Sequence, residues 1–463
     1  MDTARLPVMN PSTGEMIREI PVDDRATALG KLDAAWACFH DRSRSLALHE
    51  RIEILERLYS LMAREEQSLA ELIALEGGKP LQDALVEASR AKAGVRIAIN
   101  VISEDLGNVI PLGHQAASAG RTNMTRKFSR GVVLAFSAFN HPLNLIVHQI
   151  VPAFATGSPC VVKPASDTPL SCLRLVELMH EAGVPEDYVQ ASVVGDLEIA
   201  SEMVASDRIA FFSFIGSARV GWMLRGQLHA GVRCALEHGG VAPAIVAPSA
   251  DLSITVPSIT KGGYYHAGQV CVSTQRVYAH RSVLDELVAA LKASVSALTV
   301  GDASDASTEV GPLIRSAEVD RVESWVQEAI EAGAKVVTGG ERKEGNYFEP
   351  TLMVDVPADA KLSTMEVFGP VVCVYPYDNL DEALNAANLH PHAFQAAIYT
   401  RELDDMHKAF EAFDASAVMV NDHTAFRDDA MPFAGLSASG LGVGGIPYTI
   451  EDMQFEKMLV IKH

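Results

Sequence analysis

Residues 131–140 read GVVLAFSAFN, an apolar run that ends in an aromatic residue and an amide. The run over Val132–Ser137 predicts a short buried strand, and apolar residues at helical spacing follow over Leu143–Ala155. The same alternation continues downstream, with strand-like runs at Cys160–Lys163, Val189–Val194 and Arg208–Phe214 and helices over Pro169–Glu181 and Asp196–Ala205. Strands that alternate with helices predict βαβ crossovers and a parallel sheet, which binds ligands at the carboxyl ends of its strands.

A second α/β unit is predicted after Gly240. Its strand-like runs are Val241–Ala247, Val277–His280, Lys335–Gly339, Val371–Tyr377, Ala396–Tyr399 and Ala417–Asn421. Upstream of residue 131 the pattern is mostly helical, over Asp23–His40, Leu48–Glu76 and Leu81–Leu106, and reads as a scaffold. The fold class is therefore α/β.

Composition excludes several classes of protein. The formal charge of −21 over 463 residues argues against nucleic acid or an anionic membrane as a partner. The chain contains no run of about 20 apolar residues and no signal-like N-terminus. Its six cysteines are scattered without metal-type pairs, and its histidines lack ligand spacing, so we expect reduced thiols, no metal and a cytoplasmic location.

Three polar side chains stand out as candidates for chemistry on a carbonyl group. Residues 264–273 read YYHAGQVCVS and place Cys271 among small and apolar neighbours. Residues 236–240 read LEHGG and place Glu237 at the end of an apolar run, while Asn140 follows the strand at 132–137. A nucleophile, a base and a hydrogen-bond donor suit catalysis through a covalent thiol adduct. Each residue alone also fits a structural role, as an inert cysteine, a cap or a turn residue.

Together, and in this order, the three motifs resemble the aldehyde dehydrogenase superfamily. The resemblance runs from Asn10–Glu15 (NPSTGE) to Pro432–Gly435 (PFAG). It implies that Cys271 attacks an aldehyde, that Asn140 and the Cys271 N–H stabilise the oxyanion, and that Glu237 activates water against the resulting thioester. The expected product is the carboxylic acid, formed with NAD or NADP.

The resemblance also implies an organisation into domains. A Rossmann-like dinucleotide-binding domain is expected over 1–118 and 132–238, and a catalytic domain over 239–434. Segments 119–131 and 446–463 are expected to be protruding oligomerisation strands. An apolar edge strand needs a partner, and a second subunit is the expected one, giving a homodimer or homotetramer.

By motif position, the cofactor would contact residues on several strand ends and turns. These are Phe139, Lys163, Ser166, Gly216, Ser217, Gly221, Gly239, Glu366 and Phe368. Ser166 stands where many NAD-preferring relatives place a glutamate, so a 2′-phosphate has room and NADP fits as well as NAD. Asp167 next to it is a countervailing negative charge, and the choice between the two coenzymes stays open.

The substrate pocket would be walled by residues from four segments, namely His141, His148, Tyr265, Val270, Val272, His423, Phe426 and Arg427. Histidines with a nearby arginine predict a short polar aldehyde, bearing a hydroxyl or an anionic group. Alternatively, one or two of these histidines are satisfied by backbone partners. These segments look like those of the lactaldehyde and phosphonoacetaldehyde branch, although Asp429-Ala430 departs from the usual pattern.

Two other functions use the same residues. A coenzyme A-acylating dehydrogenase would not need Glu237, because coenzyme A instead of water would accept the acyl group. A thiol esterase would use Cys271 and Glu237 without redox chemistry. A non-catalytic protein of this fold has no physical reason to keep Cys271, Glu237 and Asn140 together.

Overall fold

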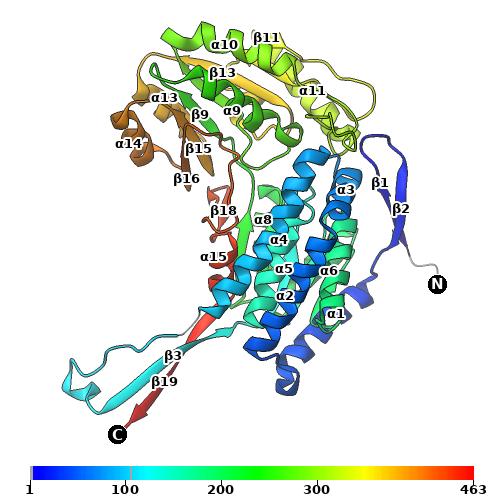
Figure 1. The fold of residues 1–463 in the computed structure, drawn as a ribbon, viewed down its shortest axis with the longest axis vertical. Coiled ribbons are helices and arrows are strands. Elements are labelled where there is room, and N and C mark those ends of the chain that lie inside the picture. The colour runs from blue at the N-terminus through cyan, green and yellow to red at the C-terminus, as the bar shows by residue number, and fades with distance from the viewer. Residues whose placement is uncertain (1–3, 105–106) are drawn as a thin grey trace.

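The computed structural model describes residues 4–104 and 107–463, and places two α/β units side by side with a two-stranded arm projecting from one of them (Figure 1). The first unit is built on a six-stranded sheet of order β18-β8-β7-β4-β5-β6. Its strands are β4 (Val132–Phe136), β5 (Cys160–Lys163), β6 (Val189–Ala191), β7 (Ile209–Ile215), β8 (Arg233–Glu237) and β18 (Gly440–Leu441). All neighbours are parallel except β18, which pairs antiparallel with β8. The predicted α/β class and parallel sheet are confirmed.

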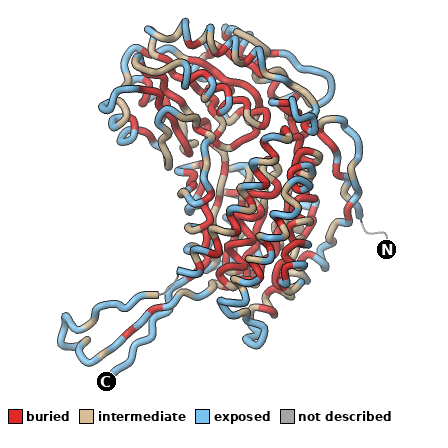
Figure 2. The backbone as a smooth tube through the Cα atoms, viewed as in Figure 1, coloured by how far each residue is buried: buried red, intermediate tan, exposed pale blue. Residues whose placement is uncertain are grey.

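Alternate residues of β4 bury into two different cores, as the twofold period of a strand requires. Val133 and Ala135 face α2 (Leu48–Arg64), α3 (Glu66–Gly77), α4 (Leu81–Ser103), α5 (Asn144–Thr156) and α6 (Leu170–Ala182). Leu134 and Phe136 face α1 (Arg25–His40), α7 (Leu197–Ala205) and α8 (Ala218–Arg225). In Figure 2 the buried residues, coloured red, run through the interior of both units, while exposed residues, coloured pale blue, lie mostly at the periphery and along the arm.

The second unit is built on a seven-stranded sheet of order β11-β12-β13-β10-β9-β15-β16. Its strands are β9 (Pro243–Val246), β10 (Arg276–His280), β11 (Lys335–Thr338), β12 (Thr351–Val354), β13 (Val371–Tyr377), β15 (Gln395–Tyr399) and β16 (Ala417–Val420). The helices are α9 (Leu252–Tyr264), α10 (Arg281–Ser296), α11 (Ser316–Glu331), α12 (Lys361–Thr364), α13 (Leu380–Ala387) and α14 (Leu403–Ala412).

The structure corrects several predicted boundaries. The single helix expected over Leu48–Glu76 is broken at Glu65, whose φ of −105° and ψ of 13° separate α2 from α3. Residues Pro11–Ile20 read as a turn and a short strand, and the structure places strand β2 (Met16–Pro21) there, paired antiparallel with β1 (Arg5–Met9). Strand β12 is not among the predicted strands. The end of the helix predicted to Leu106 lies outside the described residues.

The arm consists of β3 (Arg121–Ser129) and β19 (Gln454–Lys462), paired antiparallel along their full length. The prediction of strands throughout 446–463 is wrong for its first part, because Ile446–Asp452 forms helix α15. Ile446, Ile450 and Met453 are buried in the core that also holds α4 and α5, so these residues belong to the first unit rather than to the arm.

None of the helices in residues 4–104 and 107–463 combines the length and apolar character that crossing a membrane requires. The six cysteines are all free thiols.

Candidate active site

The predicted nucleophile, base and donor come from three separate elements. Glu237 ends β8, Asn140 lies between β4 and α5, and Cys271 follows a tight turn at Tyr265–Gly268. The Asn140 amide nitrogen donates to the Gln269 carbonyl oxygen at 2.9 Å. This bond ties the first unit to the cysteine loop and fixes the orientation of the amide, leaving its other N–H for a ligand.

The loop before Cys271 has an unusual backbone. His266, Ala267 and Gly268 lie consecutively in the left-handed region, with φ of 48°, 54° and 70°. At Gly268 a side chain would overlap the backbone of Gly369, so only glycine fits. Strain of this kind needs a surrounding structure that holds it, and it clusters at functional sites.

The Gln269 side chain supplies part of that hold. Its Oε1 accepts from the backbone N–H of Ile314 at 2.9 Å, and its Nε2 donates to the Pro312 carbonyl at 3.2 Å. The loop before the nucleophile is thus fixed both to Asn140 and to the segment that leads into α11.

Charges around Cys271 oppose ionisation of its thiol. Burial, together with the charges of Glu366 and Glu237, raises the pKa of Cys271 to about 12, although Arg427 and a backbone hydrogen bond act in the other direction. Burial also raises the pKa of Glu237, which Arg427 again opposes. The thiol is therefore protonated at neutral pH and needs a proton acceptor, while Glu237 is a stronger base than an ordinary carboxylate.

Glu366 and Gly239 make a place for a polar ligand. The Glu366 carboxylate lies against Gly239, where a Cβ would overlap it. Its Oε1 is buried and has no hydrogen-bond partner, and burial raises the pKa of Glu366 to about 8. An unsatisfied buried acceptor is costly, so this oxygen fits the hydroxyl groups of a nucleotide ribose.

The other predicted cofactor residues border the same region. Phe368 adopts a φ of 46° and its ring meets the Phe139 ring edge-on at 5.8 Å. Lys163 ends β5, and its only side-chain hydrogen bond in the described residues is long, 3.4 Å to the Pro164 carbonyl. Ser166 is half-buried in the loop that follows. These residues fit a dinucleotide, and their roles stay a prediction.

The glycine turn at the end of β7 differs from expectation. The Gly216 N–H donates to the Glu237 carbonyl at 3.0 Å, and Ser217 caps α8 without a side-chain bond. At Gly221 a Cβ would overlap the His238 ring, so this glycine serves helix-to-sheet packing rather than approach of a ligand.

The predicted substrate wall is partly apolar. Val270 and Val272 are buried with Phe394 and Phe433, and Phe426 is 45% exposed at the edge. The Tyr265 hydroxyl lies 3.3 Å from His141 Nε2. His423 keeps a buried Nδ1 without a partner.

His148 is not free to bind a substrate. Its Nε2 lies 2.7 Å from Asp429 Oδ1, and its Nδ1 lies 3.4 Å from Arg427 Nη2. Burial lowers the pKa of His148, so the ring is neutral, donating to Asp429 and accepting from Arg427. It is satisfied by side chains, not by the backbone partners considered from sequence.

Asp429 is the residue that sequence reasoning missed. Only 4% of its side chain is exposed, and it accepts from Arg90 at 2.7 Å, from Asn144 at 3.1 Å and from His148. Burial alone would raise the pKa of Asp429, but His148 and Arg90 lower it far below its ordinary value. In the sequence Asp429 is only a departure from the family pattern, and periodicity does not reveal that its partner Arg90 lies 339 positions away.

Arg427 is held at the inner end of this network. It lies 3.8 Å from Asp429 and its guanidinium stacks on the Phe433 ring at 3.5 Å. Only 11% of its side chain is exposed, and its Nη1 is buried without a hydrogen-bond partner. A buried guanidinium N–H without a partner fits an anionic or carbonyl oxygen of a ligand.

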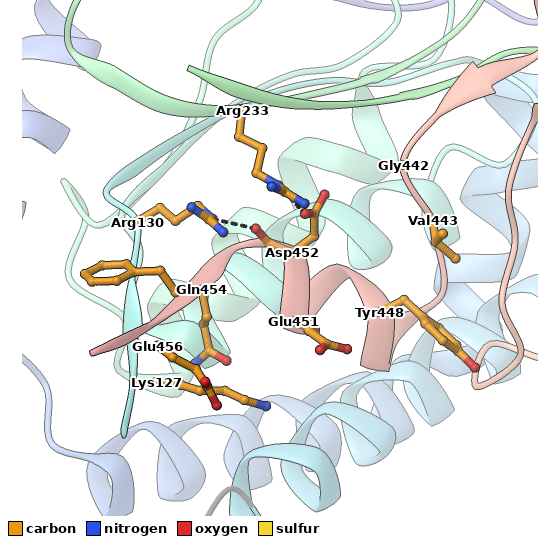
Figure 3. Close-up of a pocket in the computed structure, with 11 residues that line it drawn as sticks. Lys127, Arg130, Arg233, Gly442, Val443, Tyr448, Glu451, Asp452, Gln454 and Glu456 are labelled. Atoms are coloured by element: carbon orange, nitrogen blue, oxygen red, sulfur yellow. Dashed lines mark hydrogen bonds and ion pairs between the residues drawn. The ribbon is translucent and has the colours of Figure 1, made fainter. Parts of the chain in front are cut away.

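A cavity of about 500 Å³ lies elsewhere, at the base of the arm, between β3 and the chain after Gly440 (Figure 3). Arg130 and Arg233 point towards Asp452 there. In the described ranges, no cluster of histidine, cysteine and carboxylate side chains has the arrangement of a metal site.

Comparison with known proteins agrees with this geometry. The profile of the aldehyde dehydrogenase family matches residues 1–459. The chain belongs to the aldehyde dehydrogenase family. The predicted reaction class, NAD(P)-dependent oxidation of an aldehyde to an acid, is therefore confirmed, and the coenzyme A-acylating alternative is not favoured.

Three relatives illustrate the similarity. A 3-sulfolactaldehyde dehydrogenase of Priestia aryabhattai is 37% identical over 89% of this chain and 86% of its own, in agreement with the predicted branch. Aldehyde dehydrogenase 21 of Physcomitrella patens, in complex with the reaction product succinate, superposes with a TM-score of 0.96 at 33% identity, over 100% of this chain and 95% of that one. A glyceraldehyde-3-phosphate dehydrogenase of Methanocaldococcus jannaschii, complexed with NADP, superposes with a TM-score of 0.95 at 32% identity over 100% of both chains.

We predict that Glu366→Gln changes the pH dependence of stability in the coenzyme-free protein. The pKa of Glu366 is raised from 4.5 to about 8 in the native state, so the native protein holds this proton more tightly than the unfolded chain. Wild-type stability is therefore lost as pH rises between these values, and the glutamine variant escapes that loss. Its Tm should exceed the wild-type Tm on the order of 3 °C at pH 8.5, with a smaller difference at pH 5.

Thermal unfolding followed by circular dichroism at both pH values measures this difference. Glu344→Gln, an exposed site, is the control and should follow the wild-type curve. A constant difference across pH would contradict the prediction.

Proposed function

We propose that this enzyme oxidises a short aldehyde with an anionic tail, and that Arg427 binds the tail. The observation that carries this proposal is the buried Arg427 Nη1 without a partner, close enough to Cys271 and Glu237 to shift the pKa of both. The relatives support an anionic group, since one acts on 3-sulfolactaldehyde and another holds succinate. An uncharged hydroxyaldehyde such as lactaldehyde is the second candidate, favoured by the polar pair of His141 and Tyr265.

In the proposed reaction, the Cys271 sulfur attacks the aldehyde carbon and its proton passes through water to the solvent. The oxyanion that forms would accept hydrogen bonds from the free Asn140 N–H and the Cys271 backbone N–H. Glu366 and Phe368 would hold NAD(P), which would supply the acceptor for the hydride that the former aldehyde carbon must lose for the adduct to become a thioester.

Hydrolysis then needs a base that is not consumed earlier. Glu237 has a raised pKa and lies on a rigid strand end, where a Cβ at Gly444 would overlap its carboxylate. We assign it to removing a proton from the water that attacks the thioester.

The coenzyme would lie across the carboxyl ends of β4, β5 and β7, with Lys163 and Ser166 at its adenosine ribose. The negative charge of Asp167 is balanced by Arg315, whose Nη1 lies 3.2 Å away. This pairing, and the NADP-bound relative, support use of NADP as well as NAD. We also assign the first unit to coenzyme binding and the second to catalysis, and expect a cytoplasmic location.

We propose that the arm pairs with a second copy of this chain. Both faces of β19 are exposed although the strand is apolar, with Met458, Leu459, Val460 and Ile461 between 44% and 53% exposed. An exposed apolar strand of this length is an aggregation hazard unless another chain covers it.

The catalytic assignment predicts different failures for two variants. Cys271→Ala should form no reduced coenzyme, because no thiol adduct forms. Glu237→Gln should lower kcat by about 10²–10⁴-fold and accumulate an acyl-enzyme, visible as added intact mass. Stopped-flow absorbance and mass spectrometry measure both, with Cys234→Ala, at a half-buried cysteine elsewhere, as the control.

Normal turnover by Cys271→Ala would overturn the assignment. Ester hydrolysis without coenzyme, in the absence of aldehyde oxidation, would favour the thiol esterase.

The proposed substrate class predicts that Arg427→Gln acts selectively. We expect kcat/KM for succinic semialdehyde to fall about 10–100-fold more than kcat/KM for butanal, because only the anionic substrate loses a buried charge-assisted hydrogen bond, whereas the effect of Arg427 on Cys271 and Glu237 is common to both aldehydes. Arg401→Gln, at an exposed ion pair, is the control. Equal losses for both aldehydes would exclude an anion-binding role.

The proposed assembly predicts that Met458→Glu with Val460→Glu dissociates the oligomer. Two carboxylates cannot be buried on an apolar strand without a large desolvation cost. Sedimentation velocity should show a shift to monomer, whereas Lys343→Glu, which changes the net charge equally at an exposed site, should not. A monomeric wild-type protein would contradict the proposal.

A further inference from the structure

A row of alternating charges runs along one side of the proposed coenzyme site. Arg315 Nη1 lies 3.2 Å from Asp167, and Nη2 of the same guanidinium lies 3.0 Å from Glu318. Glu318 in turn accepts from Arg321 Nε at 2.9 Å, and Arg321 acts electrostatically on Glu366. The row therefore extends from the residue next to Ser166 to the carboxylate proposed for the other ribose.

Arg315 connects the two units at the Ser166 end of this row. It immediately precedes α11 in the second unit, whereas Asp167 lies in the loop after β5 in the first. Its side chain is 54% exposed, so the guanidinium can exchange partners without disrupting a hydrophobic core. Glu318 keeps Arg321 as its partner when Arg315 turns away.

The charge balance at this end leaves room for an anion. Arg315 is paired with Asp167 and Arg321 with Glu318, whereas the Lys163 ammonium group lies over the Phe136 ring and makes a long hydrogen bond to the Pro164 carbonyl. Burial lowers the pKa of Lys163, as expected for an ammonium group that lacks a counter-ion.

We infer that Arg315 is a specificity residue for NADP, and that it exchanges Asp167 for the 2′-phosphate of the adenosine ribose. This rests on the proposed coenzyme site at Lys163 and Ser166. A phosphate monoester carries close to two negative charges and offers three acceptor oxygens, against one charge on Asp167. Arginine matches phosphate with two parallel hydrogen bonds. NAD offers no such group, so Arg315 stays on Asp167 and contributes nothing to its affinity.

Substitutions of Arg315 and Asp167 should change the affinity for the 2′-phosphate in opposite directions. Arg315→Gln removes the phosphate ligand, whereas Asp167→Asn removes the competitor for it and frees Arg315. A residue with only a structural role in joining the two units would not separate the variants in this way.

Isothermal titration calorimetry with 2′,5′-ADP and 5′-AMP tests the inference without catalysis, since only the former carries a 2′-phosphate. Arg315→Gln should weaken 2′,5′-ADP about tenfold or more and leave 5′-AMP unchanged, as expected for one lost charge-assisted contact. Asp167→Asn should tighten 2′,5′-ADP and leave 5′-AMP unchanged. Arg342→Gln, which removes an arginine paired with Asp320 of α11, is the matched control and should affect neither.

Equal effects of Arg315→Gln on both ligands, or none on either, would overturn the inference. So would a wild-type protein that binds 2′,5′-ADP no better than 5′-AMP. An assay of coenzyme reduction distinguishes failure of this inference from failure of the proposed function. If wild type reduces NAD or NADP with aldehyde and Arg315→Gln leaves their ratio of kcat/KM unchanged, only the inference fails. If neither coenzyme is reduced, the proposed function fails, while the titrations still report on Arg315.

Discussion

The geometry of the active site depends on one ion pair in the first unit. Lys79 and Glu87 bond to each other with side chains that are fully buried. The second oxygen of Glu87 accepts from the backbone N–H groups of Leu143 and Asn144, both at 3.0 Å. These groups open α5, directly after Asn140. Since removal of either partner would leave an uncompensated buried charge, the pair fixes the start of α5 and the loop that carries the oxyanion donor.

The same device recurs nearby. Glu76 is fully buried and accepts from the backbone N–H groups of Leu170 and Ser171, the first residues of α6. Asp83 pairs with Lys261 of the second unit at 2.6 Å. Helices α3 and α4 therefore do more than support the sheet, because their carboxylates satisfy the free N–H groups of the two helices that follow the ligand-binding strand ends. Through the ion pair of Asp83 and Lys261, helix α4 also connects the first unit to the second.

These connections mark the limit of what the sequence predicts. The βαβ order and the second sheet follow from local periodicity, because residues close together in the sequence determine which face of a strand or helix is apolar. Cys271, Glu237 and Asn140 are recognisable by motif order. Glu87, Arg90 and Asp429 are not, because a charged residue on a helical pattern reads as solvent-exposed until its distant partner is known. The opposite error occurs at Gly221 and His148. Both fit a ligand-binding motif, but in the structure Gly221 packs against His238 and His148 is bonded to Asp429.

Net charge and local charge also lead to different expectations about the substrate. A protein of formal charge −21 repels an anion at long range, which by itself would disfavour an anionic aldehyde. Salt screens that repulsion beyond about 8 Å at physiological ionic strength, whereas a partly buried contact is screened much less. Within that distance the charge that counts is Arg427, which Asp429 and His148 hold with one N–H left unpaired. Asp429 in turn is offset by Arg90, so the network keeps a net positive charge at its inner end. An acidic surface and a pocket for an anion are therefore compatible, because the first acts through water and the second through a contact that excludes it.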